Sequence, residues 1–79
     1  MPSVEKIIQK MYQQPNGIRM EEADKVLKSY GFDCDRIKGS HRQYLNKETG
    51  ELITIKQETP LKRVYVQSIL DRINKTQTN

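Results

Sequence analysis

The stretch from Gly31 to Gln57, GFDCDRIKGSHRQYLNKETGELITIKQ, decides the fold that this chain of 79 residues can adopt. Its apolar residues recur with the short period that is typical of extended strands, whereas the apolar residues on either side have the spacing of helices. Three strands fit the stretch, at about residues 33–38, 41–47 and 51–57. The turn Lys47-Glu48-Thr49-Gly50 joins the second strand to the third, with a glycine where a left-handed residue follows a type I turn. A three-stranded antiparallel meander is therefore predicted.

The last of these strands has one apolar and one polar face. Ile53 and Ile55 alternate with Thr54 and Lys56, and successive side chains of a strand point to opposite faces of the sheet. One face of the sheet is therefore expected to be buried and the other to be in contact with water. Because helices must then cover the buried face, the predicted fold class is a two-layer α+β domain.

The spacing of apolar residues predicts three helices around the sheet. The first covers residues 3–13, with Ser3 as its N-cap, and a Pro-Asn-Gly turn follows it. The second covers about residues 20–30, and Gly31 is placed to end it in a left-handed conformation. The third starts at the Thr-Pro pair and covers about residues 59–74. The residues expected to face the core are Val4, Ile7, Ile8, Met11 and Tyr12 in the first helix, Met20, Ala23, Val26, Leu27 and Tyr30 in the second, and Val66, Ile69, Leu70 and Ile73 in the third.

Without its first helix, the chain has the α-β-β-β-α order of the double-stranded-RNA-binding domain. We therefore expect a fold similar to that domain, with an additional N-terminal helix. Residues 1–79 should form a single domain, made of the N-terminal helix and turn (1–17), a core (20–74) and a polar tail (75–79). This is an analogy of fold, and it does not by itself establish a function.

Charge is distributed unevenly along the chain, whose net charge is +4. Residues 1–35 carry five Lys or Arg against six Asp or Glu, whereas residues 36–79 carry nine against four. A basic half favours contact with a polyanion, although a basic pI alone is also compatible with nothing more than solubility. The single cysteine, Cys34, cannot form an intrachain disulfide, and no apolar run reaches the roughly 18 residues of a membrane span. No signal peptide is recognisable, so we expect a cytoplasmic protein without membrane association.

The residues with the clearest chemistry lie in one segment, Arg36-Ile37-Lys38-Gly39-Ser40-His41-Arg42-Gln43-Tyr44. His41, the only histidine, stands there among three cations. Imidazoles titrate near neutrality, and clustered cations attract phosphate. Gly39 lets a phosphate come close to the backbone. The segment therefore combines a candidate acid–base catalyst, His41, with candidate RNA- or phosphate-binding residues, which are Arg36, Lys38, Gly39, Ser40 and Arg42.

Several residues have competing explanations. Ser40 bonds the backbone of a turn more simply than it acts as a nucleophile, because no Asp/His arrangement supports it. One cysteine and one histidine, without a CxxC or HxxxH motif or a carboxylate cluster beside them, argue against a metal site. No cofactor is expected. Tyr44 can stack on a base or lie in the core, and Lys62 and Arg63 suit either a solvated helix face or contact with phosphate.

These residues resemble the HicA-type toxins, also called YcfA-like. The likeness covers about residues 20–74 and includes Gly31-Phe32, Arg36-x-Lys38-Gly39-Ser40-His41-x-x-Tyr44, Leu52-Ile53-Thr54-Ile55 and Val64-x-Val66-x-x-Ile69-Leu70. It implies the toxin of a type II toxin–antitoxin system, a small mRNA interferase with the fold expected above. The resemblance also implies that His41 is the catalytic residue and that a HicB-type antitoxin holds the enzyme inactive.

The chain departs from the family pattern in two places. The first helix, residues 3–13, lies before the minimal family core. The segment Lys56-Gln57-Glu58-Thr59-Pro60 stands where many members have a segment with proline and histidine. A second catalytic imidazole therefore cannot be assigned.

Cleavage of RNA without a metal fits the residues themselves. The reaction deprotonates a ribose 2′-hydroxyl, stabilises charge on the phosphorane and protonates the leaving 5′-oxygen. A base with a pKa near 7 contributes roughly 10²- to 10⁴-fold, and nearby cations can stabilise the developing anion. The proton donor stays open between His41 in a second role, Tyr44, a lysine, water and a second subunit.

We therefore expect RNA to bind the wet face of the sheet and His41 to cleave it. The antitoxin is expected to cover the same basic surface in a toxin–antitoxin hetero-oligomer. One alternative is a nonenzymatic RNA-binding module, which the basic half and the fold would also serve. Another is a protein-interaction domain in which the first helix docks a partner and RNA has no part.

Overall fold

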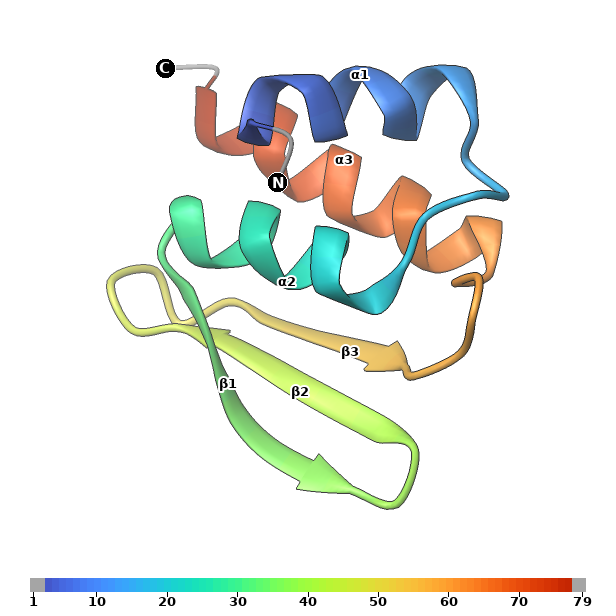
Figure 1. The fold of residues 1–79 in the computed structure, drawn as a ribbon. Helices are drawn as coiled ribbons and strands as arrows, with labels where there is room; N and C mark the ends of the chain where they lie inside the picture. Colours follow the sequence, from blue (N-terminus) through green and yellow to red (C-terminus); the bar gives the residue numbers. More distant parts are fainter. Residues whose placement is uncertain (1–2, 78–79) are drawn as a thin grey trace.

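The computed structural model describes residues 3–77, and it has three strands in one sheet with three helices on one side of it (Figure 1). The strands are antiparallel and lie in the order β1-β2-β3. The predicted α+β fold, with an α-β-β-β-α core and an additional N-terminal helix, is confirmed. In chain order the elements are α1 (Val4–Gln13), α2 (Met20–Ser29), β1 (Phe32–Lys38), β2 (His41–Asn46), β3 (Leu52–Lys56) and α3 (Arg63–Gln77).

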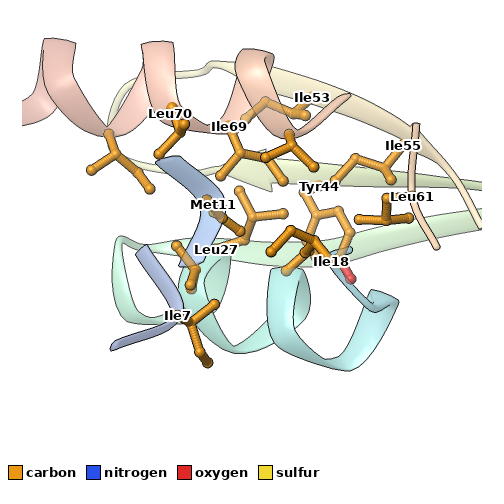
Figure 2. Packing of buried hydrophobic residues seen from close by; sticks show 14 of the residues in the cluster. Ile7, Met11, Ile18, Leu27, Tyr44, Ile53, Ile55, Leu61, Ile69 and Leu70 are labelled. Carbon is orange, nitrogen blue, oxygen red and sulfur yellow. The ribbon is translucent and has the colours of Figure 1, made fainter. Parts of the chain in front are cut away.

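The core lies between the sheet and the helices (Figure 2). Nearly all the residues predicted to face it are buried or packed against it. Tyr12 is an exception, because its side chain is 56% exposed and its hydroxyl exchanges hydrogen bonds with the side chain of Asn74. The buried hydrophobic residues are Ile7, Met11, Ile18, Met20, Ala23, Val26, Leu27, Phe32, Tyr44, Ile53, Ile55, Leu61, Val66, Ile69, Leu70 and Ile73.

Local signals at the ends of the elements are also confirmed. The hydroxyl of Ser3 accepts a hydrogen bond from the backbone N–H of Lys6 at the start of α1 (3.3 Å). Gly31, after α2, has a φ of 89°, and Gly50, before β3, has a φ of 78°. These left-handed conformations favour glycine, because a side chain would strain the backbone there. The observed strands agree with the predicted ones to within one residue at each end.

The start of α3 was predicted wrongly. The helix begins at Arg63 and not at the Thr59-Pro60 pair. Leu61 explains the difference, because its side chain is buried in the core and its backbone N–H donates to the carbonyl of Ile18 (2.8 Å). The chain thus first crosses to the loop that precedes α2, and only then turns into a helix.

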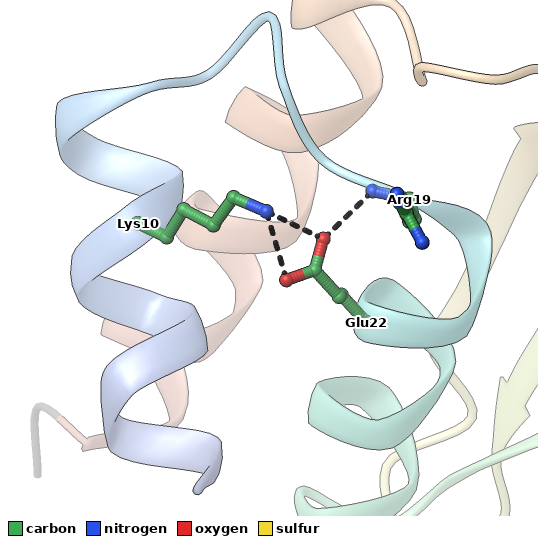
Figure 3. Close-up of polar contacts among 3 residues, drawn as sticks. All are labelled: Lys10, Arg19 and Glu22. Atoms are coloured by element: carbon green, nitrogen blue, oxygen red, sulfur yellow. Dashed lines mark hydrogen bonds and ion pairs between the residues drawn. The ribbon is translucent and has the colours of Figure 1, made fainter. Parts of the chain in front are cut away.

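Helix α1 is attached to α2 by a polar cluster as well as by apolar packing (Figure 3). Nζ of Lys10 lies 3.0 Å from both carboxylate oxygens of Glu22. The same carboxylate accepts a hydrogen bond from the backbone N–H of Arg19 (3.0 Å), which satisfies a free donor at the start of α2. Burial raises the pKa of Glu22, but the bonds from Arg19 and Lys10 outweigh burial, so this pKa is lowered.

Candidate active site on the helix-free face of the sheet

The register of the sheet places His41 on the face that no helix covers. Tyr44 of β2 lies opposite Ile53 of β3, and both side chains are buried under the helices. Side chains alternate between the two faces along a strand, so Gln43, next to Tyr44, lies on the opposite, helix-free face. His41 is two residues before Gln43 and therefore lies on the same helix-free face, where its side chain is exposed.

Both cross-strand neighbours of His41 are lysines. Lys38 of β1 pairs with His41 on one side, and Lys56 of β3 pairs with it on the other. Directly opposite residues of antiparallel strands have Cβ atoms only about 4.5–5.5 Å apart. These three residues, which we name the lysine–histidine row, therefore bring one side chain from each strand together. Neither lysine belongs to the ion pairs found among residues 3–77.

A bulge in β1 places Arg36 on the same face. In a regular strand Cys34 and Arg36 would share a face, because they are two residues apart. The pairing shifts between them, so that Cys34 lies opposite Tyr44 while Arg36 lies opposite Gln43. Such a shift accommodates one extra residue on the bulged strand, here Asp35. Cys34 is therefore half-buried on the helix side, and Arg36 is exposed on the helix-free face.

The turn between β1 and β2 consists of Gly39 and Ser40 alone. Gly39 has a φ of 60°, and a Cβ atom there would meet nothing within 4 Å. The backbone conformation of a two-residue turn, and not crowding, therefore requires this glycine. The carbonyl of Ser40 accepts a hydrogen bond from the backbone N–H of Gln57 (2.6 Å), which extends the β2–β3 pairing past His41.

The structure separates Arg42 from the other predicted phosphate-binding residues. Arg42 lies opposite Ile55, which is fully buried, so its side chain is on the helix side of the sheet. Its Nε donates to Oε1 of Gln57 (2.8 Å), and a hydrogen bond with Tyr44 raises the pKa of the Arg42 guanidinium. Arg42 lines a pocket of about 500 Å³ beside α2. The structure thus groups Arg36, Lys38, Gly39 and Ser40 with His41, but not Arg42.

Tyr44 belongs to the core. Its ring is fully buried, and its hydroxyl donates to Oδ1 of Asp24 in α2 (2.6 Å). Burial, followed by the hydrogen bond to Asp24, raises the pKa of Tyr44. Because Tyr44 and His41 point to opposite faces, Tyr44 neither stacks on a base at the helix-free face nor supplies a proton there.

Comparison with known proteins gives the family. The family model described as the HicA toxin of bacterial toxin-antitoxin matches residues 20–74, from the start of α2 to α3. The chain belongs to the HicA toxin family. Its family role is that of the toxin in a toxin–antitoxin pair, with an antitoxin as its partner. The matched residues include the lysine–histidine row and leave out α1. No curated protein and no solved structure matches the chain.

Lys56 is the residue of this HicA-family site that the sequence interpretation missed. Lys56 lies on the polar face of the third strand, as Thr54 does. The residue opposite it on β2 depends on the length of the turn between the two strands. Counting residue pairs outward from the turn at residues 47–50 would have placed Lys56 opposite His41. Lys62 and Arg63, the other cations considered, are exposed at the start of α3, where Nζ of Lys62 lies 3.9 Å from Glu58.

The residues that the structure describes include neither a cluster that could bind a metal nor a helix that could span a membrane. Within residues 3–77, no three His, Cys, Asp or Glu side chains are grouped so that they could hold a metal ion. Over the same range, no helix is long and apolar enough to span a membrane.

Proposed function

We propose that this HicA-family toxin is a metal-independent endoribonuclease that cleaves mRNA with His41 as its single catalytic histidine. The lysine–histidine row carries this proposal, because it sets an exposed imidazole between two ammonium groups on an open face. Arg36 extends the positive charge along β1 on the same face. Cations on an open surface attract the RNA backbone, and an imidazole beside the bound phosphate can act as an acid or a base.

The proposed reaction needs a base, a site for the negative charge and a proton for the leaving oxygen. His41 accepts the proton of a ribose 2′-hydroxyl, and the 2′-oxygen then attacks the adjacent phosphorus. A bond forms between phosphorus and the 2′-oxygen, and the bond between phosphorus and the 5′-oxygen breaks. The 5′-oxygen leaves with the electron pair and takes up a proton from the imidazolium of His41, from a lysine, from water or from a second subunit. The cations around His41 stabilise the charge on the phosphorane, which is where fixed donors contribute most to a rate. Since mRNA is the proposed substrate, we expect the toxin to act in the cytoplasm.

Substitution of His41 tests the proposal. We expect His41→Ala to lose cleavage of an RNA transcript by at least about 100-fold, while its circular dichroism and its RNA affinity stay close to those of the wild type. Gln43→Ala is the matched control, because Gln43 is the next residue of β2 on the same face, and it should keep cleavage. Cleavage should also persist in EDTA.

Two results would contradict this assignment in different ways. A wild type that binds RNA and never cleaves it would support the nonenzymatic RNA-binding module. Equal cleavage by His41→Ala and the wild type would leave an enzyme whose catalytic residue is another one.

We also propose that a HicB-type antitoxin inhibits the toxin by covering the helix-free face in a hetero-oligomer. The positions of Arg36, Lys38 and Lys56 support this, because an antitoxin with acidic groups could pair with them and exclude RNA at the same time. Reversing the charge of Lys38 and Lys56 to Glu should weaken the complex. A complex in which RNA still reached His41 would contradict the proposal.

A further inference from the structure

We propose that Lys56 is a catalytic residue of this ribonuclease, whose ammonium group binds the scissile phosphate and stabilises the charge that develops on it. The inference rests on the proposed function, because RNA supplies the phosphate. Its geometric basis is the direct pairing of Lys56 with His41 across β2 and β3. A phosphate beside the imidazole is then also beside Lys56.

The position of Lys56 distinguishes it from the other cations near His41. Arg36 lies one pair farther along the sheet, opposite Gln43, and Arg42 points to the other face. Lys38 also pairs with His41 and, like Lys56, ends an edge strand, but Ile37, the residue before it, is 58% exposed. The residue before Lys56, Ile55, is instead fully buried, so Lys56 is the neighbour of His41 whose strand is held in the core next to the site.

The backbone around Lys56 is held on both sides. Ile55, the residue before it, is fully buried. Gln57, the residue after it, donates its backbone N–H to Ser40 (2.6 Å) and accepts a side-chain hydrogen bond from Arg42 on the opposite face (2.8 Å). A charged donor on a fixed backbone is already in place when charge develops, which is the condition for strong stabilisation of a transition state.

The ammonium group of Lys56 is also available to a ligand. The side chain is half-exposed, and Lys56 is in none of the ion pairs found in the part of the chain that the structure describes. By contrast, Lys10 and Arg72 each lie 3.0 Å from a carboxylate. A lysine that lacks such a partner can give its full charge to a phosphate.

In the proposed step Lys56 transfers no proton. The phosphorus–2′-oxygen bond forms, the phosphorus–5′-oxygen bond breaks, and the 5′-oxygen leaves with the electron pair and takes its proton from water or from a group other than Lys56. The ammonium group donates hydrogen bonds to the nonbridging oxygens throughout and keeps its three protons. This requires positive charge at position 56, and an arginine can supply that charge as well.

The test is single-turnover cleavage of a short RNA at saturating concentration, together with a separate measurement of RNA affinity. Lys56→Ala should cleave at about one hundredth of the wild-type rate or below. Its loss in rate should exceed its loss in affinity. Lys56→Arg should recover most of the rate. Lys47→Ala is the matched control, because Lys47 is exposed in the turn at the far end of β2 and carries the same charge. It should cleave like the wild type.

Each of the other outcomes contradicts one part of the proposal: the catalytic role of Lys56, the stabilisation of charge or the proposed function. If Lys56→Ala cleaves as fast as Lys47→Ala, or loses affinity without losing rate at saturation, Lys56 is not catalytic although the proposed function can stand. If Lys56→Arg is as slow as Lys56→Ala while both are folded by circular dichroism, charge stabilisation is wrong. If the wild type does not cleave RNA, the proposed function fails, and the inference about Lys56 fails with it.

Discussion

Neighbouring residues of β2 point into different surroundings. His41 and Gln43 lie on the helix-free face, whereas Arg42 and Tyr44 point toward α2. The hydroxyl of Tyr44 is the polar atom of a buried ring, and Asp24 satisfies it. This contact ties the strand that carries His41 to the helical layer.

We predict that Tyr44→Phe lowers the free energy of unfolding by about 1–3 kcal/mol, because hydrogen bonds to charged groups contribute about that much. Urea denaturation at pH 7 measures the change. Tyr12→Phe is the control, since that hydroxyl lies on an exposed side chain, and it should change stability by less. Equal effects of the two substitutions would contradict the prediction.

The same substitution should change the response to alkaline pH. The folded structure raises the pKa of Tyr44 above its ordinary value of 10.0, so the unfolded chain loses this proton first. The stability that the group contributes is therefore fully present below pH 10 and declines as the pH rises above that value. The difference in stability between the wild type and Tyr44→Phe should shrink above about pH 10. A constant difference from pH 8 to 11 would contradict this.

The positions of single residues could be predicted from sequence where neighbours along the chain determine them. His41, Lys38 and Gly39 lie close together because the turn between them is short. Arg42 was grouped with them for the same reason, although alternation along a strand sends it to the other face. Lys56 was missed because cross-strand partners depend on register, which sequence proximity does not show.

Among the elements, α1 lies outside the residues that the family model matches, yet it is part of the core. Ile7 and Met11 are fully buried, and Lys10 pairs with Glu22 of α2. The apolar stripe of α1 thus packs on α2 and α3 (Figure 1). The apolar face of α1 is consequently not free to dock another protein.

We predict that Ile7→Ala lowers the free energy of unfolding by about 2–4 kcal/mol, because it removes buried methyl groups and leaves a cavity. Gln9→Ala, an exposed position of the same helix, should change it by less than about 0.5 kcal/mol. Urea denaturation of the two variants decides between a packed and a loosely attached helix. Similar stability of both variants would show that α1 is loosely attached.

The elements themselves could be predicted because each has a strong period and a clear end. Ser3, Gly31 and Gly50 mark boundaries through local backbone chemistry, which sequence shows directly. The start of α3 could not be predicted, because it depends on Leu61 reaching the core and bonding Ile18. The bulge at Asp35 was likewise hidden, since it exists only relative to the pairing of β1 with β2.

Across the whole molecule, the two faces of the sheet have separate tasks. The helix side holds the core, and the helix-free face carries three cations around one imidazole. A net charge of +4 is modest, so the arrangement of these cations matters more than their number. Binding of RNA should therefore depend on this face and not on the basic residues of α3.

We predict that the logarithm of the association constant for single-stranded RNA falls with the logarithm of salt concentration with a slope of roughly −2, for three phosphate contacts. Lys38→Ala should reduce the magnitude of this slope by about 0.7. Arg63→Ala should leave it unchanged, because Arg63 lies in the helical layer. A titration of fluorescent RNA at several salt concentrations measures the slope for the wild type and for both variants. A slope that Arg63→Ala also reduces would place part of the RNA on α3.

The separation of the faces has a practical consequence for surface-based assays. Helix α1 starts and helix α3 ends in the helical layer (Figure 1), whereas the register of the strands places His41 on the opposite, helix-free face of the sheet. A flexible tether joined to either helix would therefore hold the protein with its helix-free face toward the solution. Injected RNA or antitoxin would meet the lysine–histidine row unobstructed on a sensor chip, whereas immobilisation through random lysines would consume Lys38 and Lys56 themselves.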